Sequence, residues 1–127
     1  MTYQILIVDD SKLARMAAIK ALNALHPDWT RVEATNAEEA LALAKQSPPD
    51  IALLDFNMPG RDGLALAADF LALNPDMPIA VISANLQQEV VAQASKAGAI
   101  FLPKPLTQDA LKGFLTIAVE RIGAAGR

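Results

Sequence analysis

The sequence contains no cysteine and only one histidine, His26, among its 127 residues. Disulfide frameworks, zinc fingers and cysteine nucleophiles are therefore excluded, and so is a histidine-rich site for a transition metal. Any metal ion would have to bind to oxygen atoms.

Positive charge is also scarce, because 11 lysine and arginine residues stand against 14 aspartate and glutamate residues. The net charge of −3 does not give the positive surface that binding to a phosphate backbone requires. No apolar run approaches the roughly 18 residues of a membrane span, and residues 1–4 lack the charged segment of a signal peptide. We therefore expect a cytoplasmic protein that binds neither nucleic acid directly nor a membrane.

Hydrophobic residues make up 53% of the chain and charged residues 20%, which is enough apolar surface for a real core. This length and composition predict one domain over residues 1–122, followed by a short flexible tail at residues 123–127.

Short apolar runs alternate with segments of helical period along the whole chain. Continuous apolar runs are typical of strands that are buried on both faces of a parallel sheet. Five alternations of strand and helix predict an α/β fold, a doubly wound parallel sheet with right-handed crossovers. The expected strands are residues 5–8, 31–34, 51–54, 79–82 and 100–102.

Several residues mark the expected ends of the helices. Asn36 and Thr107 are candidate N-caps, because a side-chain oxygen there can accept a hydrogen bond from the first turn. The helical pattern stops at His26 and at Asn74, each followed by proline, and Gly98 is placed to close the fourth helix.

Polar side chains follow four of the expected strands at the point where each strand ends. In open α/β sheets the ligand site lies beyond the carboxyl ends of the strands, so we expect these side chains to converge on one pocket. They are Asp9 and Asp10, Asp55, Ser83 and Lys104.

Three carboxylates packed together repel one another, and a divalent cation would remove that cost. Oxygen ligands in a pocket that also handles phosphate favour Mg²⁺. The alternative is that Asp9, Asp10 and Asp55 are ordinary caps and turn residues, which are common after strands.

The loops after two strands are constrained by proline and glycine. Pro59 fixes a φ angle after Asp55, and Gly60 and Gly63 permit backbone shapes that are closed to other residues. Lys104 lies between two prolines, which favour extended backbone and permit a cis bond.

These residues resemble the receiver domains of two-component response regulators, in particular the single-domain CheY-like members. The resemblance covers nearly the whole chain and implies a flavodoxin-like fold with strand order 2-1-3-4-5. It also implies that Asp55 accepts a phosphoryl group. The matching motifs are Asp9-Asp10, the loop from Asp55 through Met58-Pro59 to Asp62-Gly63, Ser83-Ala84 and Lys104-Pro105.

The resemblance assigns a role to each residue of the pocket. Asp10 and Asp55 would bind Mg²⁺ through carboxylates, Asn57 through its backbone carbonyl, and Asp9 directly or through water. Lys104 and Ser83 would hold phosphoryl oxygens.

Further roles follow from the same resemblance. Phe101 occupies the position of an aromatic switch that turns inward together with Ser83 after phosphorylation, although packing in the core is an alternative. Asn57 and Asn85 would tune the lifetime of the acyl phosphate.

The implied partners are a histidine kinase or histidine phosphotransfer protein as donor, and a downstream protein or a second copy of the chain as receiver of the signal. The last helix has an apolar arc wider than the roughly 100° needed to cover a core. We expect the excess to form an output face with Phe101, Phe114 and Ile117. A deeply set helix packed on both sides is the alternative.

Other functions are less consistent with the residues. An aspartate-nucleophile phosphatase resembling haloacid dehalogenases would have a second aspartate at Asn57, and Asp9-Asp10 would repel the phosphate of a flavin or nucleotide. A Ser-His-Asp hydrolase would need His26, far from the strand ends. A receiver that acts as a scaffold without phosphorylation remains an alternative. We expect no enzyme with a separate substrate, only a chain that catalyses its own phosphorylation and dephosphorylation.

Overall fold

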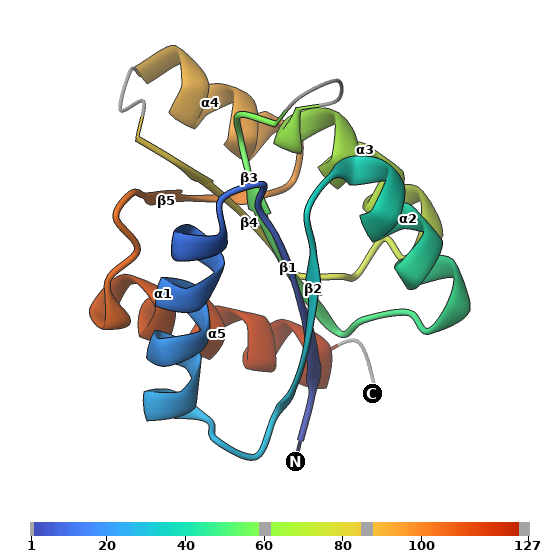
Figure 1. The fold of residues 1–127 in the computed structure, drawn as a ribbon. Helices are drawn as coiled ribbons and strands as arrows, with labels where there is room; N and C mark the ends of the chain where they lie inside the picture. Colours follow the sequence, from blue (N-terminus) through green and yellow to red (C-terminus); the bar gives the residue numbers. More distant parts are fainter. Residues whose placement is uncertain (1, 59–61, 85–87, 125–127) are drawn as a thin grey trace.

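In the computed structural model, which describes residues 2–58, 62–84 and 88–124, strands and helices alternate along the chain (Figure 1). The strands are β1 (Gln4–Val8), β2 (Thr30–Ala34), β3 (Ile51–Asp55), β4 (Ile79–Ser83) and β5 (Ile100–Pro103). The helices are α1 (Lys12–Leu25), α2 (Ala37–Gln46), α3 (Gly63–Leu73), α4 (Gln88–Lys96) and α5 (Gln108–Ala124).

The strands form one parallel sheet in the order β2-β1-β3-β4-β5. The predicted α/β fold with strand order 2-1-3-4-5 is therefore confirmed. Every residue of β3 and β4 is buried, whereas β2 lies at an edge and is largely half-buried or exposed. The continuous apolar runs thus mark the strands covered on both faces.

Helices cover both faces of the sheet in two layers. Helices α1 and α5 pack on one face, and α2, α3 and α4 on the other (Figure 1). Successive residues of β3 show the alternation, since Leu53 belongs to the cluster that contains Phe114, and Leu54 to the cluster that contains Phe70. No helix in the described part of the chain is both long and apolar enough to cross a membrane.

The helix ends follow the predicted pattern. Asn36 accepts a hydrogen bond from the Glu39 backbone N–H at 2.8 Å, and Thr107 accepts one from Ala110 at 3.1 Å, so both predicted N-caps are confirmed. Gly98 has a φ of 88°, the left-handed conformation that favours glycine after a helix.

Several boundaries differ from the prediction, each by one or two residues. Asp55 and Ser83 are the last residues of β3 and β4 rather than the first residues of loops, so the sheet itself holds their backbones. Helix α5 continues to Ala124, which makes residues 123 and 124 helical instead of part of a tail. Residues 125–127 lie outside the described residues.

Candidate functional site

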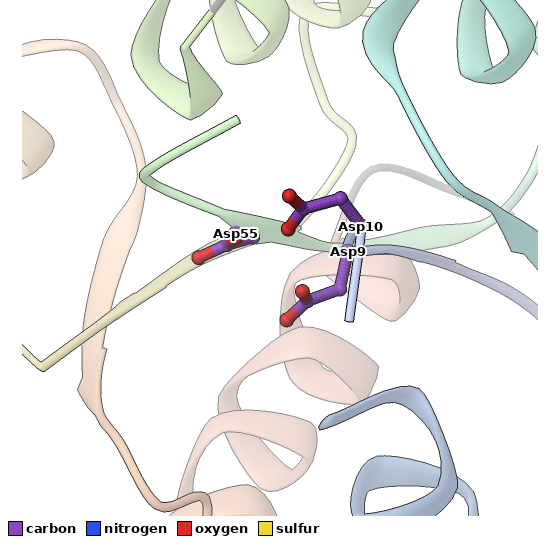
Figure 2. A group of neighbouring side chains, drawn as sticks. All are labelled: Asp9, Asp10 and Asp55. Atoms are coloured by element: carbon purple, nitrogen blue, oxygen red, sulfur yellow. The ribbon is translucent and has the colours of Figure 1, made fainter. Parts of the chain in front are cut away.

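Three carboxylates meet at the carboxyl end of the sheet, as the sequence predicts. One carboxylate oxygen from each of Asp9, Asp10 and Asp55 lies within 4.8 Å of the other two, and Figure 2 shows the three side chains together. They come together because β1 and β3 are parallel neighbours, with Val8 paired to Leu54 just before the aspartates. Asp9 and Asp55 are buried, whereas Asp10 is exposed.

The ammonium group of Lys104 pairs with two of these carboxylates. Its Nζ lies 3.0 Å from Oδ2 of Asp9 and 3.0 Å from Oδ1 of Asp55. The Lys104 backbone N–H donates to the carbonyl of Ser83 at 3.0 Å, which ties the end of β5 to the end of β4. The predicted convergence of Lys104 on the acidic pocket is confirmed, and the peptide bond between Lys104 and Pro105 is cis.

Burial and the ion pairs shift two pKa values in this site. Burial raises the pKa of Asp55 above its ordinary value of 3.8, and the charge of Asp9 adds to this, while the hydrogen bond from Lys104 opposes it. Burial acts to lower the pKa of Lys104, but hydrogen bonds and charge attraction from Asp55 and Asp9 raise it above 10.5. Lys104 therefore stays charged, and the carboxylate of Asp55 carries a cost that a further cation would reduce.

The backbone and side chain of Asp9 are both fixed by hydrogen bonds. Its N–H donates to the carbonyl of Ala34 at 3.1 Å, and its Oδ1 accepts from the Ser11 N–H at 2.9 Å. Its carbonyl accepts from Nη1 of Arg15 at 2.7 Å. Arg15 is not among the residues predicted from the sequence, because an arginine in an amphipathic helix has no pattern that distinguishes it from a solvent-exposed charge.

Gly63 is needed after Asp55, but for a different reason from the one predicted. It requires no unusual φ; instead, a β-carbon there would lie 3.0 Å from the carbonyl carbon of Asp55 and 3.1 Å from the Cα of Phe56. Its N–H donates to the carbonyl of Phe56 at 3.0 Å, which closes the turn into α3. Pro59 and Gly60 lie outside the described residues.

The other residues predicted for the pocket differ in how far they are exposed to solvent. Asn57 is exposed, and its backbone makes a hydrogen bond that lowers the pKa of Asp55. Ser83 is buried and is followed by the exposed Ala84. Asn85 lies outside the described residues.

The predicted output face is not one surface in this structure. Phe114 is only 2% exposed and belongs to the core, because α5 is covered by α1 as well as by the sheet. Phe101 is half-buried against the apolar cluster on the opposite face of the sheet. Of the three residues expected there, only Ile117 is exposed, at 46%, so the alternative of a deeply set helix is correct for Phe114.

A cavity of about 450 Å³ opens beside the acidic site, between α1 and the segment that follows β5. Its lining includes buried residues of the sheet together with Asp9 and Lys104. Its walls include Leu13, Ala14, Ala17, Pro105 and Leu106.

The side chains at this site fit a Mg²⁺ ion. All three carboxylates offer oxygen atoms, which this hard cation prefers as ligands. The exposure of Asp10 leaves room for the water molecules that Mg²⁺ normally retains.

Comparison with known proteins shows similarity over nearly the whole chain. Residues 5–116 match the response regulator receiver domain family. The chemotaxis protein CheY of Thermotoga maritima is 37% identical over 106 residues, which are 83% of this chain and 88% of that protein. The positive alginate biosynthesis regulatory protein of Pseudomonas aeruginosa is 40% identical over 111 residues, 84% of this chain. The chain spans only about half the length of several such relatives, 43% of that regulator and 53% of the glycerol metabolism activator of Pseudomonas putida.

Solved structures agree with this similarity. The receiver domain of NtrX from Brucella abortus superimposes with a TM-score of 0.82 at 30% identity, covering 91% of this chain and 98% of that one. A CheY-like receiver domain protein from Methanospirillum hungatei gives a TM-score of 0.86 over 98% of this chain and 99% of that one. At its 24% identity, that second match shows the shared fold alone.

Proposed function

This chain belongs to the response regulator receiver domain family of two-component systems, and from this premise we propose that Asp55 accepts a phosphoryl group. The donor is the phosphohistidine of a histidine kinase or histidine phosphotransfer protein. The observation that carries the proposal is the position of Asp55, a buried carboxylate paired with an ammonium group at 3.0 Å and adjacent to two further carboxylates.

In the proposed reaction, a carboxylate oxygen of Asp55 forms a bond to phosphorus as the bond between phosphorus and the donor imidazole nitrogen breaks. The electron pair of the broken bond returns to that nitrogen. Lys104 already lies against Asp55 and would neutralise charge on the transferred oxygens, together with the Ser83 hydroxyl. Positioning and electrostatic stabilisation do most of the catalysis in phosphoryl transfer, and these groups supply both.

The same pocket would hold Mg²⁺ through Asp9, Asp10 and Asp55, with the backbone carbonyl of Asn57 as a further ligand. When bound, the ion supplies a Lewis acid that draws charge from the phosphoryl oxygens. The raised pKa of Asp55 supports this assignment. Burial disfavours the ionised form of this carboxyl group, and a second cation beside it would stabilise that form.

We also propose that the donor protein docks on α1 over the cavity beside Lys104. Leu13 is 78% exposed and Met16 is 53% exposed on this helix, and Leu13 lines the cavity. Exposed apolar side chains next to a reactive carboxylate suit a partner that brings its phosphohistidine to Asp55 and covers apolar surface. A cytoplasmic location for this exchange is part of the proposal.

The phosphorylated chain would signal to a downstream protein or to a second copy of itself. We propose that Ser83 and Phe101 change position after phosphorylation and alter the surface near α4, β5 and α5. Val91 on α4, 37% exposed, and Ile117 on α5 are exposed apolar residues available there. Phe114 is not part of this proposed surface.

Mass spectrometry of the intact protein after incubation with Mg²⁺ and acetyl phosphate tests the proposal. One phosphoryl group per chain is expected on the native sequence and none on Asp55→Asn. Asp109→Asn is the matched control, because it removes an exposed carboxylate in α5. Labelling of Asp55→Asn to the native level would refute the site, and absence of labelling in the native protein would favour the scaffold alternative.

A further inference from the structure

Arg15 links three separate segments next to the acidic site. It extends from α1 and donates through Nη1 to the carbonyl of Asp9 at 2.7 Å, at the tip of β1. Its Nε donates to Oε1 of Glu33 in β2 at 3.0 Å. The Arg15 side chain is 13% exposed, so packing as well as hydrogen bonding restrains the guanidinium group.

We propose that Arg15 is a positioning residue of the magnesium site, which sets the direction of the Asp10 carboxylate by holding the Asp9 carbonyl. This inference rests on the proposed function, since it assigns a residue to the metal site described above. Arg15 itself is a cation and is not a metal ligand.

The peptide group explains how Arg15 acts on Asp10. The Asp9 carbonyl belongs to the planar peptide unit that runs from the Cα of Asp9 to the Cα of Asp10, so fixing the carbonyl oxygen also restrains the Cα of Asp10. The Asp9 N–H is already tied to Ala34, so the backbone of Asp9 is held on both sides. Asp10 is exposed, unlike Asp9 and Asp55, and burial in the core does not orient it.

The paired contacts require an arginine rather than any cation. A guanidinium group presents several donors in a rigid plane, and it can hold Glu33 with one nitrogen while another holds Asp9. A lysine at this position would keep the charge but offer one compact donor group, which cannot span both acceptors in the same way.

Two possible roles of Arg15, as a charge and as a positioning residue, predict opposite effects of Arg15→Met on Mg²⁺ affinity. If Arg15 acted only through its charge, Arg15→Met would strengthen Mg²⁺ binding, because one cation near the site would be gone. If Arg15 positions Asp10, the same variant weakens binding. Residues that orient metal ligands typically change metal affinity by about 10-fold to 100-fold when they are replaced.

The test is calorimetric titration of the unphosphorylated full chain with Mg²⁺. We expect the dissociation constant to rise about 10-fold in Arg15→Met and severalfold in Arg15→Lys, which conserves charge. Arg31→Lys is the matched control, because it makes the same exchange at a half-buried arginine of β2, and it should leave the dissociation constant unchanged.

A second readout needs no metal. In metal-free protein, the amide resonance of Asp10 should shift in Arg15→Lys, while the thermal midpoint stays close to that of the native sequence. Glu33→Gln should weaken Mg²⁺ binding in the native background and have a smaller effect in the Arg15→Met background, because Glu33 acts through Arg15.

Unchanged or tighter Mg²⁺ binding by Arg15→Lys would overturn the inference while leaving the proposed function intact. If Arg15→Met does not fold, the charge-conserving Arg15→Lys decides the question alone. Failure of the native chain to bind Mg²⁺ would instead overturn the metal site, and this inference with it.

Discussion

Gly63 packs against the main chain of Asp55 so closely that no β-carbon fits between them. A β-carbon at position 63 would lie 3.0 Å from the carbonyl carbon of Asp55, and Gly63 is also the first residue of α3. The start of this helix and the main chain of the proposed phosphoryl acceptor are therefore in direct contact, and a side chain added at position 63 must displace one of them.

Gly63→Ala should shift the backbone of Asp55 or the start of α3, because the clash is with main-chain atoms. We expect the free energy of unfolding to fall by about 1–3 kcal/mol, as for other overpacked sites, and labelling of Asp55 by acetyl phosphate to slow. Urea denaturation and the rate of labelling measure the two effects. Gly113→Ala in α5 is the control, since a β-carbon at position 113 would have no atom within 4 Å, and it should raise stability by about 0.5–1 kcal/mol. Equal free energies of unfolding for Gly63→Ala and Gly113→Ala would contradict the predicted clash at position 63.

Lys104→Met should destabilise the metal-free protein, because it leaves the carboxylates of Asp9 and Asp55 without their shared cation. We expect the free energy of unfolding to fall by about 1–2 kcal/mol. This is less than the loss expected for a fully buried ion pair, because the Lys104 side chain is 27% exposed. Mg²⁺ should then raise the thermal midpoint of this variant more than that of the native chain, since no ammonium group competes for the carboxylates. Lys112→Met, at an exposed position of α5, should behave like the native chain in both measurements. A smaller Mg²⁺ effect in Lys104→Met would show that Lys104 does not compete with the metal.

The strand ends made much of this site predictable from the sequence. Asp9 follows a buried apolar run, Asp55 ends one, and Lys104 follows the apolar run of β5, and parallel strands bring such ends to one edge. The role of Arg15 could not be read in the same way, because it depends on how far a flexible side chain reaches between α1 and β2. The periodicity of α5 is misleading at Phe114 because a helix packed on both a sheet and another helix buries a wider arc than one packed on a sheet alone.

The raised pKa of Asp55 should make the free energy of unfolding depend on pH in the acidic range. The folded-state pKa of Asp55 is above 3.8, so the folded chain binds its proton more tightly than the unfolded chain does. The resulting contribution to stability is complete below pH 3.8 and is lost as the pH rises through the folded-state pKa. In metal-free protein, the free energy of unfolding of Asp55→Asn should no longer show this decrease as the pH rises. A variant profile with the same acidic slope as the native chain would contradict the raised pKa.

The alkaline side of the same profile should depend on Lys104. Its folded-state pKa is above 10.5, so its contribution is complete below pH 10.5 and is lost as the pH rises through the folded-state pKa. The difference in unfolding free energy between the native chain and Lys104→Met should therefore narrow in strongly alkaline, metal-free solution. A difference that stays constant through that range would indicate that packing of the lysine stem, rather than its charge, accounts for the effect.

Leu13→Glu should slow phosphoryl transfer from a protein donor without slowing labelling by acetyl phosphate. Leu13 is 78% exposed and lines the cavity beside Lys104, so only a donor that docks on α1 would meet the new charge. Leu73→Glu in α3 is the matched control, because Leu73 is also exposed, at 51%. Equal slowing with both kinds of donor would place the defect in the pocket instead of the docking surface.

The central sheet separates two apolar clusters of residues. Phe101 and Leu102 are neighbours in β5, yet they belong to apolar clusters on opposite faces, one with α2, α3 and α4 and the other with α1 and α5 (Figure 1). Substitutions without shared neighbours generally have additive effects on stability. Under the proposed function, gene duplicates of this chain could therefore change donor contacts on α1 and target contacts on α4 in separate steps, with additive effects on stability.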